Sequence, residues 1–422
     1  MALKRVATTH LPTQAGRPKV VVVVGGSIAG LSCAHALLSA GWEVTVVEKT
    51  GSPPSGIPNG AGLGLDREAQ ELLCRWISPE LVDDGTLPLS IDMNRAIDSE
   101  KKISWTLARD DDFGFRAAHW ADLYSLLHGA LPPGIVLWGH LFLRCHSSED
   151  ASTVRIDARV LSTGEIVEIS ANLLVAADGC LSSVRRQFMP DFKLRYSGYT
   201  AWRGVLDFSG KEDSETITGL RRAYQELGHC LYFDLANKTH CVLYELKNKK
   251  INWIWYNNQP EPKLKGNSVT MKISDDIVEK MHNDAEVIWL PELAKIMKET
   301  KEPFINVIYD SDPLPRLCWG NVVLVGDAAH PTSPHGLRST NMSISDAGAL
   351  GCCLETWGPE NLTSALEQYQ SIRLPVVSKQ VLNARRMGRI KQGLPLPDGR
   401  CFIQQPPPQS TAESFGRGID AA

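Results

Sequence analysis

The sequence predicts an α/β protein that combines a parallel sheet, an inserted and mostly antiparallel sheet, and a C-terminal helical segment. Four short apolar runs, at Val20–Val24, Val44–Val47, Leu173–Ala176 and Val322–Val325, each lead into Gly, Asp or Glu. Near-continuous apolar strands of this kind are typical of a parallel sheet that is covered on both faces and binds ligands at the strands' carboxyl ends. Because the runs are far apart along the chain, distant segments must assemble the sheet.

The composition is that of a globular protein with few other biases. The chain has 422 residues, 43% of them hydrophobic, which is enough for two or three structural units. A net charge of −4 with mixed charges argues against a basic surface for nucleic acid. No segment approaches the roughly 20 apolar residues of a membrane-spanning helix. We therefore expect neither a nucleic-acid partner nor an integral membrane segment.

Cysteine usage and the N-terminus indicate a cytoplasmic protein. The ten cysteines show no CxxC spacing, so buried thiols are expected rather than a disulfide framework or a metal site. The first 18 residues carry three basic side chains and no acid, but lack the apolar segment of a secretory signal. They are expected to form a flexible tail, and a role in organelle targeting stays open. A monomer or a homodimer fits the sequence equally well.

The middle and the end of the chain differ in character from the apolar runs. Between Tyr196 and Tyr256, short alternating stretches predict antiparallel strands with one buried face. From Thr363 to Gln392 the spacing is helical, but Pro375 should break or kink the helix. The Pro- and Ser-rich stretch from Gln404 onward predicts a flexible tail.

A glycine turn after the first strand has the features of a dinucleotide phosphate site. Gly25 fits the tight bend and Gly30 the close contact between helix and strand, while Ser27 stands where phosphate would approach. The following helix would direct its first amides, including those of Ile28 and Ala29, at that charge. The alternative is a turn that merely packs a helix on a strand.

The next strand supports the dinucleotide interpretation. It ends at Glu48, followed by Lys49, close to the offset of about 20 residues expected for an acid that binds ribose hydroxyls. A glutamate at this position favours a cofactor with a free 2′-hydroxyl. A second glycine-rich segment, Gly60–Gly64, follows a Pro-rich loop instead of an apolar strand, so it is expected to be a loop near the cofactor or a connector.

Two further segments point to a family. "LLVAADGCLSSVRR" at Leu173–Arg186 and "VVLVGDAAHPTSPHGLRSTNMSISDAG" at Val322–Gly348, together with the turn at Gly25, resemble the motifs of the group A flavoprotein monooxygenases. The motifs stand in the family's order and the likeness covers nearly the whole chain. The resemblance implies a Rossmann-like FAD-binding domain of the p-hydroxybenzoate hydroxylase type, with NADPH or NADH as transient electron donor.

The resemblance also implies domain boundaries. The FAD-binding domain would be discontinuous, comprising residues 19–75, 105–190 and 305–360, and the substrate-binding domain would comprise residues 76–104 and 191–304. C-terminal helices would occupy residues 361–395, between flexible tails at residues 1–18 and 396–422.

Cofactor-binding roles follow by position in the motifs. Asp178 and Gly179 would serve FAD and passing NAD(P)H, and Asp327 would hold the ribityl or ribose part. The loop from Pro331 to Asn341 would wrap the isoalloxazine ring through Pro334, Gly336 and Leu337. Arg116 resembles the family's flavin-phosphate arginine, and Leu141 stands where an adenine-contacting residue is expected.

The sequence departs from the family pattern at two places. The loop usually continues Gly-Gly-Gln-Gly after the proline, but here it reads His-Gly-Leu-Arg-Ser from His335 to Ser339. Trp120 stands where many members have arginine, and with "YTAWRG" at Tyr199–Gly204 it resembles the branch that contains 2,6-dihydroxypyridine hydroxylase. The first departure puts the ring contacts in doubt.

The implied reaction uses NAD(P)H and O2 to hydroxylate a small aromatic or heteroaromatic substrate. Reduced FAD would form a C4a-hydroperoxide that delivers an electrophilic oxygen, and no metal is required. A base near a phenolic substrate would help, and His335 is the candidate, with a structural histidine as the alternative. Other functions left open are epoxidation of an alkene, a reductase or halogenase, and a non-catalytic FAD-fold binding protein.

The inserted sheet supplies candidates for substrate contacts. Alternation places Tyr232 and Asp234 on one face and Leu231 and Phe233 on the other, without showing which face is inward. Ordinary core packing is the alternative for each aromatic side chain. The candidates are Arg203, His229, Tyr232, His240, Tyr244 and Trp255.

Overall fold

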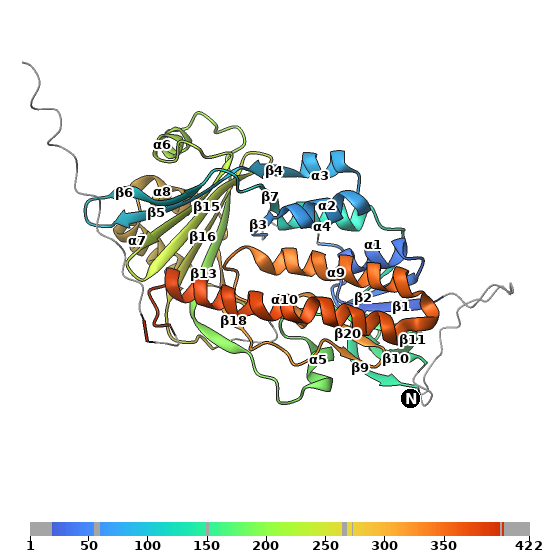
Figure 1. Cartoon of the computed structure of the whole chain (residues 1–422). Helices are drawn as coiled ribbons and strands as arrows, with labels where there is room; N and C mark the ends of the chain where they lie inside the picture. The colour runs from blue at the N-terminus through green and yellow to red at the C-terminus, as the bar shows by residue number, and fades with distance from the viewer. Residues whose placement is uncertain are drawn as a thin grey trace, which may run out of the picture.

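The computed structural model describes residues 19–54, 60–148, 152–263, 268–271, 273–396 and 399–400. The expected N-terminal tail and residues 401–422 of the expected C-terminal tail lie outside the described residues. Figure 1 shows two lobes joined side by side, with the long C-terminal helix running along both of them. In the described part of the chain, no helix has the length and apolar character needed to cross a membrane.

A six-stranded sheet forms the centre of the first lobe. Its strands are all parallel except for the edge pair β19–β20, and their order is β19-β20-β12-β1-β2-β8. Their bounds are β1 Val20–Val24, β2 Glu43–Glu48, β8 Val136–Trp138, β12 Leu173–Ala176, β19 Cys318–Trp319 and β20 Val322–Leu324. The four apolar runs of the sequence are thus strands of one sheet, as predicted.

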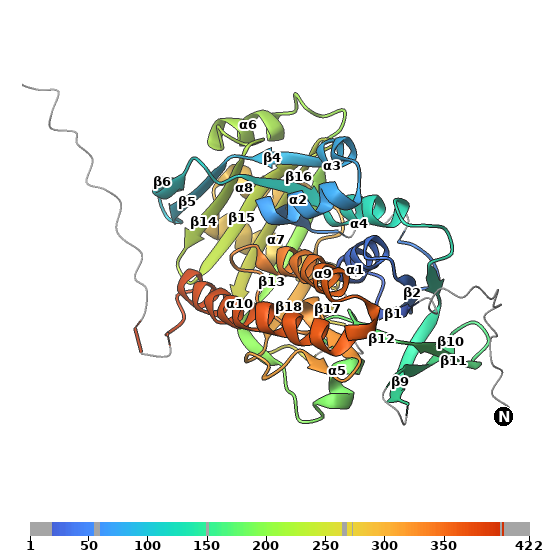
Figure 2. The ribbon, with the colours of Figure 1, turned by 45° about the vertical axis from the view of Figure 1, so that its right-hand side comes forward.

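Helices and a small sheet cover this central sheet. Helices α1 (Ile28–Ser39), α9 (Arg338–Trp357) and α10 (Leu362–Lys391) pack in succession, with α4 (Trp120–Gly129) beside α1. A three-stranded sheet packs beneath β1 and β2, as Figure 2 shows. Its strands are β9 His140–Ser147, β10 Val154–Val160 and β11 Ile166–Ala171. The apolar strands are therefore buried on both faces, which explains their near-continuous hydrophobicity.

An eight-stranded sheet forms the second lobe. Its order is β17-β18-β13-β16-β15-β14-β5-β6, antiparallel except for β14 and β5. The bounds are β5 Ile91–Asp98, β6 Ile103–Asp110, β13 Arg195–Asp207, β14 Cys230–Ala236, β15 Thr239–Leu246, β16 Lys250–Asn258, β17 Thr270–Met271 and β18 Phe304–Asp310. Strands β6 and β18 belong to this sheet, although the expected boundaries placed most of their residues in the FAD-binding domain.

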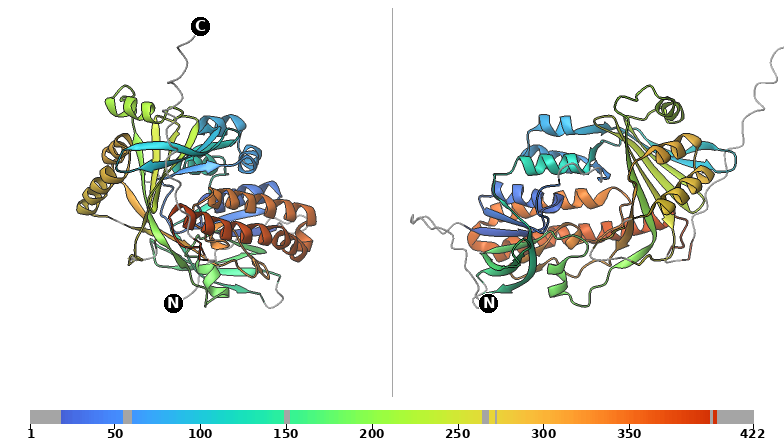
Figure 3. Two further views of the ribbon diagram at one scale, coloured as in Figure 1. Left: turned by 60° about the vertical axis from the view of Figure 1, so that its left-hand side comes forward. Right: turned by 180° about the vertical axis from the view of Figure 1, so that it is seen from behind.

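The two faces of the large sheet are buried against different partners. Helices α6 (Glu215–Ala223), α7 (Asp275–Ile288) and α8 (Pro291–Glu299) cover the outer face, and the inner face is turned toward the first lobe (Figure 3). On β14, Tyr232 packs with the outer core, whereas Leu231 and Phe233 pack with the inner one. Phe233 therefore lies on the side where the two lobes meet.

Smaller elements connect the lobes. Residues 62–64 of the Gly60–Gly64 segment belong to β3, a strand of a three-stranded sheet, so this part of the segment is not a loop or connector. The remaining bounds are β3 Gly62–Leu65, α2 Arg67–Trp76, α3 Pro79–Gly85, β4 Thr86–Leu89, β7 Phe115–His119, α5 Ser183–Phe188, η1 Gly326–Ala328 and η2 Pro359–Asn361.

Of the two outcomes expected at Pro375, a break or a kink, the structure of α10 contradicts the break. The helix runs without interruption for 30 residues, with Pro375 inside it. The residue whose carbonyl loses its hydrogen bond, Ser371, is exposed, so water can replace the missing amide. The opposite side of the helix buries Tyr369, Arg373 and Val377 against the core. Packing of that side outweighs the loss of one hydrogen bond.

A buried ion pair on the outer face of the large sheet gives a test of the fold. Arg95 donates to both carboxylate oxygens of Asp234 at 2.8 Å, and the Tyr224 hydroxyl donates to the same carboxylate at 2.6 Å. Arg95→Ala would leave a buried carboxylate without its cation, so we expect the free energy of unfolding in urea to fall by about 3–5 kcal/mol.

The control is Lys298→Ala, which removes an ion pair with Glu286 in which both side chains are more than half exposed. This substitution should leave the unfolding midpoint nearly unchanged. Equal effects of the two substitutions would contradict the importance given to the buried pair.

Candidate active site

Two cavities lie along the carboxyl edge of the six-stranded sheet. The large cavity, of about 960 Å³, lies beyond β1, β2 and β12. The small cavity, of about 260 Å³, lies between the inner face of the large sheet and residues 331–337, here termed the Pro334 loop. Residues 178–181, which follow β12, contribute to both cavities.

The turn from β1 to α1 requires glycine at two positions. Gly25 has a φ of +105°, and a Cβ there would overlap the Ala177 carbonyl oxygen. A Cβ at Gly30 would overlap the Gly25 carbonyl oxygen, so this glycine allows the helix to approach the strand. Ser27 precedes the helix but caps none of its amides through its side chain. The first-turn amides, including those of Ile28 and Ala29, are thus arranged to bind an anion.

Glu48 stands beside that turn. One of its carboxylate oxygens accepts from the Gly26 amide at 2.7 Å and the other from the Thr50 amide at 2.8 Å. Its side chain is therefore held at the wall of the large cavity next to the expected phosphate position. The sequence-predicted residues on this wall are Gly25, Ser27, Glu48, Lys49, Leu141, Asp178 and Gly179.

Helix α4 contributes to the large cavity an aromatic wall that was not among the sequence-predicted site residues. Trp120 and Tyr124 are one turn apart, stack with centroids 5.3 Å apart, and both line the large cavity. The Tyr124 hydroxyl is buried and has no hydrogen-bond partner among the described residues. Burial, and then the nearby Glu48, raises the pKa of Tyr124 to about 12, so the hydroxyl remains a donor. An unpartnered donor in a cavity of this size fits a polar ligand.

The segment after β12 is tied to the segment after β20. The Asp178 carboxylate accepts from the Ser182 hydroxyl at 2.5 Å and from the Ser183 amide at 2.7 Å, and so caps α5. The buried Arg185 on that helix donates to the carbonyl oxygens of Asp327, at 3.2 Å, and Ala328, at 2.7 Å. The two sequence motifs therefore form one rigid structure between the cavities.

Asp346 on α9 holds the start of the Gly-Asp motif, which consists of Gly326 and Asp327 after β20. Its fully buried carboxylate accepts from the Gly326 amide at 2.8 Å, from His330 at 2.6 Å and from Arg373 at 2.8 Å. Although burial raises it, these partners hold the pKa of Asp346 below its ordinary value. The side chain of Asp327 points instead to the small cavity, accepts from the Ser339 hydroxyl at 2.8 Å, and has its pKa raised by burial.

The Pro334 loop forms one wall of the small cavity. Pro334, Gly336 and Leu337 all line it, and α9 begins directly afterwards with Leu337 in the left-handed region at φ +56°. Asn341 lies behind the wall, where its amide donates to the Leu337 carbonyl at 2.5 Å and to the Gly64 carbonyl at 2.9 Å. The amino end of α9, which has no acidic side chain in its first turn, is thus braced beside the cavity.

The large sheet supplies the opposite wall, which is mostly apolar. Phe233, Val242 and Ile254 contribute to it, together with two polar groups that lack partners. The Arg203 Nε and the Tyr244 hydroxyl are buried and have no hydrogen-bond partner among the described residues. A ligand with an oxygen at this position would satisfy both groups.

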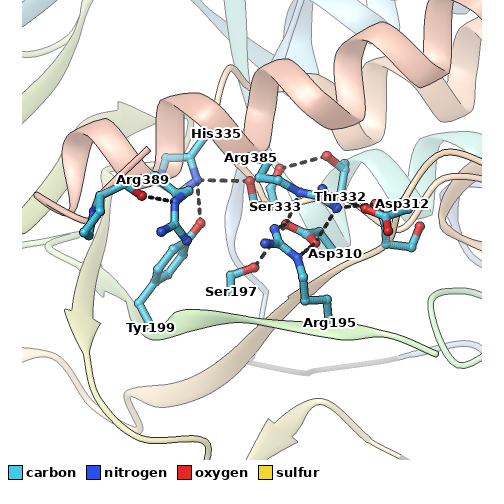
Figure 4. Close-up of polar contacts among 12 residues, drawn as sticks. Arg195, Ser197, Tyr199, Asp310, Asp312, Thr332, Ser333, His335, Arg385 and Arg389 are labelled. Atoms are coloured by element: carbon cyan, nitrogen blue, oxygen red, sulfur yellow. Dashed lines mark hydrogen bonds and ion pairs between the residues drawn. The ribbon is translucent and has the colours of Figure 1, made fainter. Parts of the chain in front are cut away.

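His335 and His240 meet across the boundary between the lobes. The Nε2 atoms of the two rings are 3.3 Å apart, and His335 Nδ1 lies 3.3 Å from both the Tyr199 and the Ser333 hydroxyl oxygens (Figure 4). His240 Nδ1 donates to the side-chain amide oxygen (Oε1) of Gln392 at 2.9 Å. His240 Nε2 therefore accepts from His335, whose Nδ1 accepts from a hydroxyl.

This arrangement weakens the hypothesis that His335 acts as a base. Both of its ring nitrogens already have partners in the protein. Burial, and then the positive charge of Lys391, lowers the pKa of His335 to about 3. A neutral imidazole whose two nitrogens are both hydrogen-bonded within the protein accepts a substrate proton poorly. The geometry favours the structural alternative for this residue.

Several other candidates lie away from both cavities. Tyr232 and Trp255 point to the outer face of the large sheet, and His229 is exposed in the turn before β14. Arg116 donates to the Thr86 hydroxyl at 2.6 Å and pairs with Asp83 at 3.0 Å. Its guanidinium group is therefore already bound by residues of α3 and β4. The alternation of β14 did not predict the inward face, because α6 to α8 bury the other face equally well.

Comparison with known proteins agrees with this geometry. Residues 313–384 match an FAD-binding domain model and residues 23–56 an NAD(P)-binding Rossmann-like domain model. The chain is 25% identical to 6-hydroxynicotinate 3-monooxygenase of Pseudomonas fluorescens, over 85% of this chain and 88% of the relative. It is 26% identical to 3-amino-4-hydroxybenzoate 2-monooxygenase of Streptomyces cremeus, over 90% and 88%.

A solved structure extends the likeness to the whole fold. The 2,6-dihydroxypyridine-3-hydroxylase of Arthrobacter nicotinovorans superposes with a TM-score of 0.75, at 22% identity, over 90% of this chain and 95% of the neighbour. The relatives that match most of the chain are FAD-dependent aromatic monooxygenases, and the chain has the fold of the group A flavin hydroxylases. It is an FAD-dependent oxidoreductase that uses NAD(P)H.

The residues present fit FAD. The glycine turn and the free amides of α1 would hold the diphosphate, and Glu48 a ribose. Asp327 would hold the ribityl chain at the passage between the cavities, and the Pro334 loop would hold the ring. The unpartnered Tyr124 hydroxyl in the large cavity is consistent with a bound polar group.

The turn at Gly25 yields a prediction for cofactor content. Gly25→Ala would place a Cβ on the Ala177 carbonyl and distort the phosphate end of the cavity, so we expect purified protein with less than about a tenth of the wild-type flavin absorbance. Gly134→Ala is the matched control, because Gly134 also has a positive φ, of +81°, but nothing lies within 4 Å of its Cβ position. Normal flavin content in Gly25→Ala would refute the predicted role of the turn.

The paired imidazoles yield a prediction for pH dependence. Burial depresses the pKa of His335 to about 3 and that of His240 well below its ordinary value. The unfolded chain therefore binds protons below about pH 6.5 that the folded chain does not, and stability falls as the pH drops. Each imidazole contributes up to about 1.4 kcal/mol per pH unit.

The measurement is the free energy of unfolding between pH 7.5 and pH 5. The double variant His240→Gln/His335→Asn should lose stability less steeply than the wild type as the pH falls. Parallel curves for the two proteins would show that neither imidazole is held neutral by the fold.

Proposed function

We propose that this monooxygenase hydroxylates a small, planar aromatic or heteroaromatic compound that binds as an anion. The observation that carries the proposal is the pair of buried, unpartnered polar groups on Arg203 and Tyr244 in a mostly apolar wall. Arg203 is the only arginine or lysine among the described residues that line the small cavity. A carboxylate, phenolate or enolate oxygen would neutralise its charge and accept a hydrogen bond from Tyr244.

The dimensions of the small cavity support a single ring. Its volume of about 260 Å³ would be shared with the expected flavin ring, and apolar side chains such as Val242, Ile254 and Ile308 line the space. The names of the two relatives specify 6-hydroxynicotinate and 3-amino-4-hydroxybenzoate, which are both hydroxylated aromatic carboxylates. The same substrate chemistry would complement Arg203 here.

The chain's own residues prepare the site for oxygen transfer. When bound, FAD takes electrons from NAD(P)H and activates O2. The amino end of α9 would stabilise negative charge on the pyrimidine side of the ring through its dipole. Arg203 and Tyr244 would orient the substrate and favour its electron-rich ionised form. The apolar wall would exclude water from the reacting atoms.

The structure offers no group poised as a base among the histidines of the cavity. We therefore propose that Arg203 stabilises a substrate that is already ionised, in place of the base role first considered for His335. The nine described cysteines are free thiols, in keeping with the proposed cytoplasmic location.

The test is a comparison of charged rings with neutral rings of the same shape. Purified flavoprotein is supplied with NAD(P)H, 18O2 and either 6-hydroxynicotinate or 6-hydroxynicotinamide as probes. We expect the acid to stimulate NAD(P)H oxidation more than the amide and to acquire one labelled ring hydroxyl. Labelled epoxide from alkene probes, with no response to any ring compound, would favour the epoxidase alternative instead.

Arg203→Gln tests the anchor itself. Removal of a charge-assisted hydrogen bond costs about 1.5–3 kcal/mol, so KM for an acidic ring should rise about 10- to 100-fold, while that for the matching amide changes little. Arg144→Gln serves as control, because Arg144 is 65% exposed on the small sheet of the first lobe. An equal rise in KM for acid and amide would show that Arg203 acts only in packing.

A further inference from the structure

The end of α10 lies directly behind side chains that line or support the small cavity. A Cβ at Gly388 would overlap the Tyr199 hydroxyl and lie 2.8 Å from His335 Nδ1, so the helix passes directly against these side chains. One turn later, Gln392 accepts the hydrogen bond from His240. This part of the helix thus lies one side chain away from the cavity.

Buried ion pairs hold α10 in this position. Arg385 donates to the Asp310 carboxylate at 3.0 Å and to the Ser311 carbonyl at 2.8 Å, and Arg195 of β13 donates to the same carboxylate at 2.9 and 2.7 Å (Figure 4). The Ser311 amide in turn donates to the Pro331 carbonyl at 3.1 Å. The helix end therefore has a fixed register relative to the Pro334 loop.

Lys391, the last residue of α10, is directed at the cavity wall. Its Nζ lies 3.1 Å from the centroid of the Phe233 ring, and Phe233 lines the small cavity. Lys391 has no ion-pair partner among the described residues, although the carboxylate of Asp92 on β5 influences its charge. The Asp92 carboxylate therefore offsets part of the ammonium charge without forming an ion pair with it.

The charge of Lys391 reaches the cavity. Its positive charge is among the causes that lower the pKa of both His335 and His240, whose rings line the same space. A ligand across the Phe233 ring would lie about 7 Å from Nζ, where the part of the charge that Asp92 does not offset still acts through protein. The same field would stabilise an anionic ligand.

We propose that Lys391, acting through Phe233, is a second positioning cation that makes the small cavity select the ionised form of its aromatic ligand. This inference rests on the proposed function and extends it from one cation to two. Arg203 would contact the anionic group directly, while Lys391 would bias the whole cavity toward negative charge from behind an apolar ring. The ring prevents a direct salt bridge, so the ligand remains free to orient on Arg203 and Tyr244.

The proposal has a pH signature. Burial lowers the pKa of Lys391 to about 7, opposed by Asp92, so its charge is lost as the pH rises from 6 to 9. The other charged or titratable groups around it are His240 on β15, His335 in the Pro334 loop, and Lys238, which contacts Gly393. Both histidines remain neutral throughout this range. Binding of an anion should therefore weaken with rising pH and take up a proton at Lys391.

The experiment measures binding of benzoate and of benzamide to the FAD-loaded protein through the change in flavin absorbance. Benzoate stays ionised from pH 6 to 9, so any pH dependence belongs to the protein. In the wild type, benzoate should bind more tightly than benzamide, and its advantage should shrink as the pH rises. Lys391→Met should reduce the advantage about tenfold at pH 6 and remove its pH dependence, with benzamide binding unchanged.

Two further variants separate charge from packing. Lys391→Arg should keep the preference for benzoate but show no titration up to pH 9, because a guanidinium stays charged. Lys379→Met, on the exposed side of the same helix, should behave as the wild type. If Lys391→Met binds FAD poorly, retention of the preference in Lys391→Arg still supports the proposal, and its loss there overturns it.

Two results overturn the inference in distinguishable ways. An unchanged preference and pH dependence in Lys391→Met, or an equal loss of benzoate and benzamide binding, would assign Lys391 a structural role only. Absence of any preference for benzoate in the wild type would instead contradict the proposed anionic substrate, and this inference would fall with it.

Discussion

The buried carboxylate of Asp346 is the constraint on which the site depends. It joins the Gly326 amide, His330 and Arg373, and thereby fastens α9, α10 and the Gly-Asp motif to one another. Loss of one partner from such a group typically costs about 3–5 kcal/mol, because the remaining charge stays buried. The Pro334 loop begins one residue beyond His330, so the position of one cavity wall follows from this single side chain.

The opposite wall of the small cavity comes from the second lobe. Contacts between aromatic and imidazole rings fix the position of one wall relative to the other. His240 stacks on Tyr256 with centroids 4.4 Å apart, and both rings approach His335 within about 5 Å. Neutral imidazoles suit this position, because a charged pair would repel across the boundary. Under the proposed function, the first lobe supports the cofactor, and selection among ligands would belong to the inner face of the large sheet and to the end of α10.

Sequence patterns predicted the strands and the glycine turn of the first lobe well, because apolar runs and turn glycines are recognisable in short segments of the sequence. The overlaps at Gly25 and Gly30 leave only glycine, and strand β1 ends where the apolar run ends. The second lobe was harder to predict, since both of its faces are buried and a period of two does not identify the inward one. Arg116 was assigned by motif alone, and its partners on α3 and β4 come from distant segments. Lys391 carried no sequence signal, because its relation to Phe233 exists only after folding.

The unbroken course of α10 has a mechanical consequence. The helix packs on α9 in the first lobe, and its carboxyl end contacts side chains of the second lobe. A single continuous helix therefore crosses the boundary between the lobes. A hinge motion that separates the two lobes would have to bend α10 or break its contacts with one of them. Entry of small molecules to the two cavities should therefore depend on local movement of loops and side chains, without a change in the relative position of the two lobes.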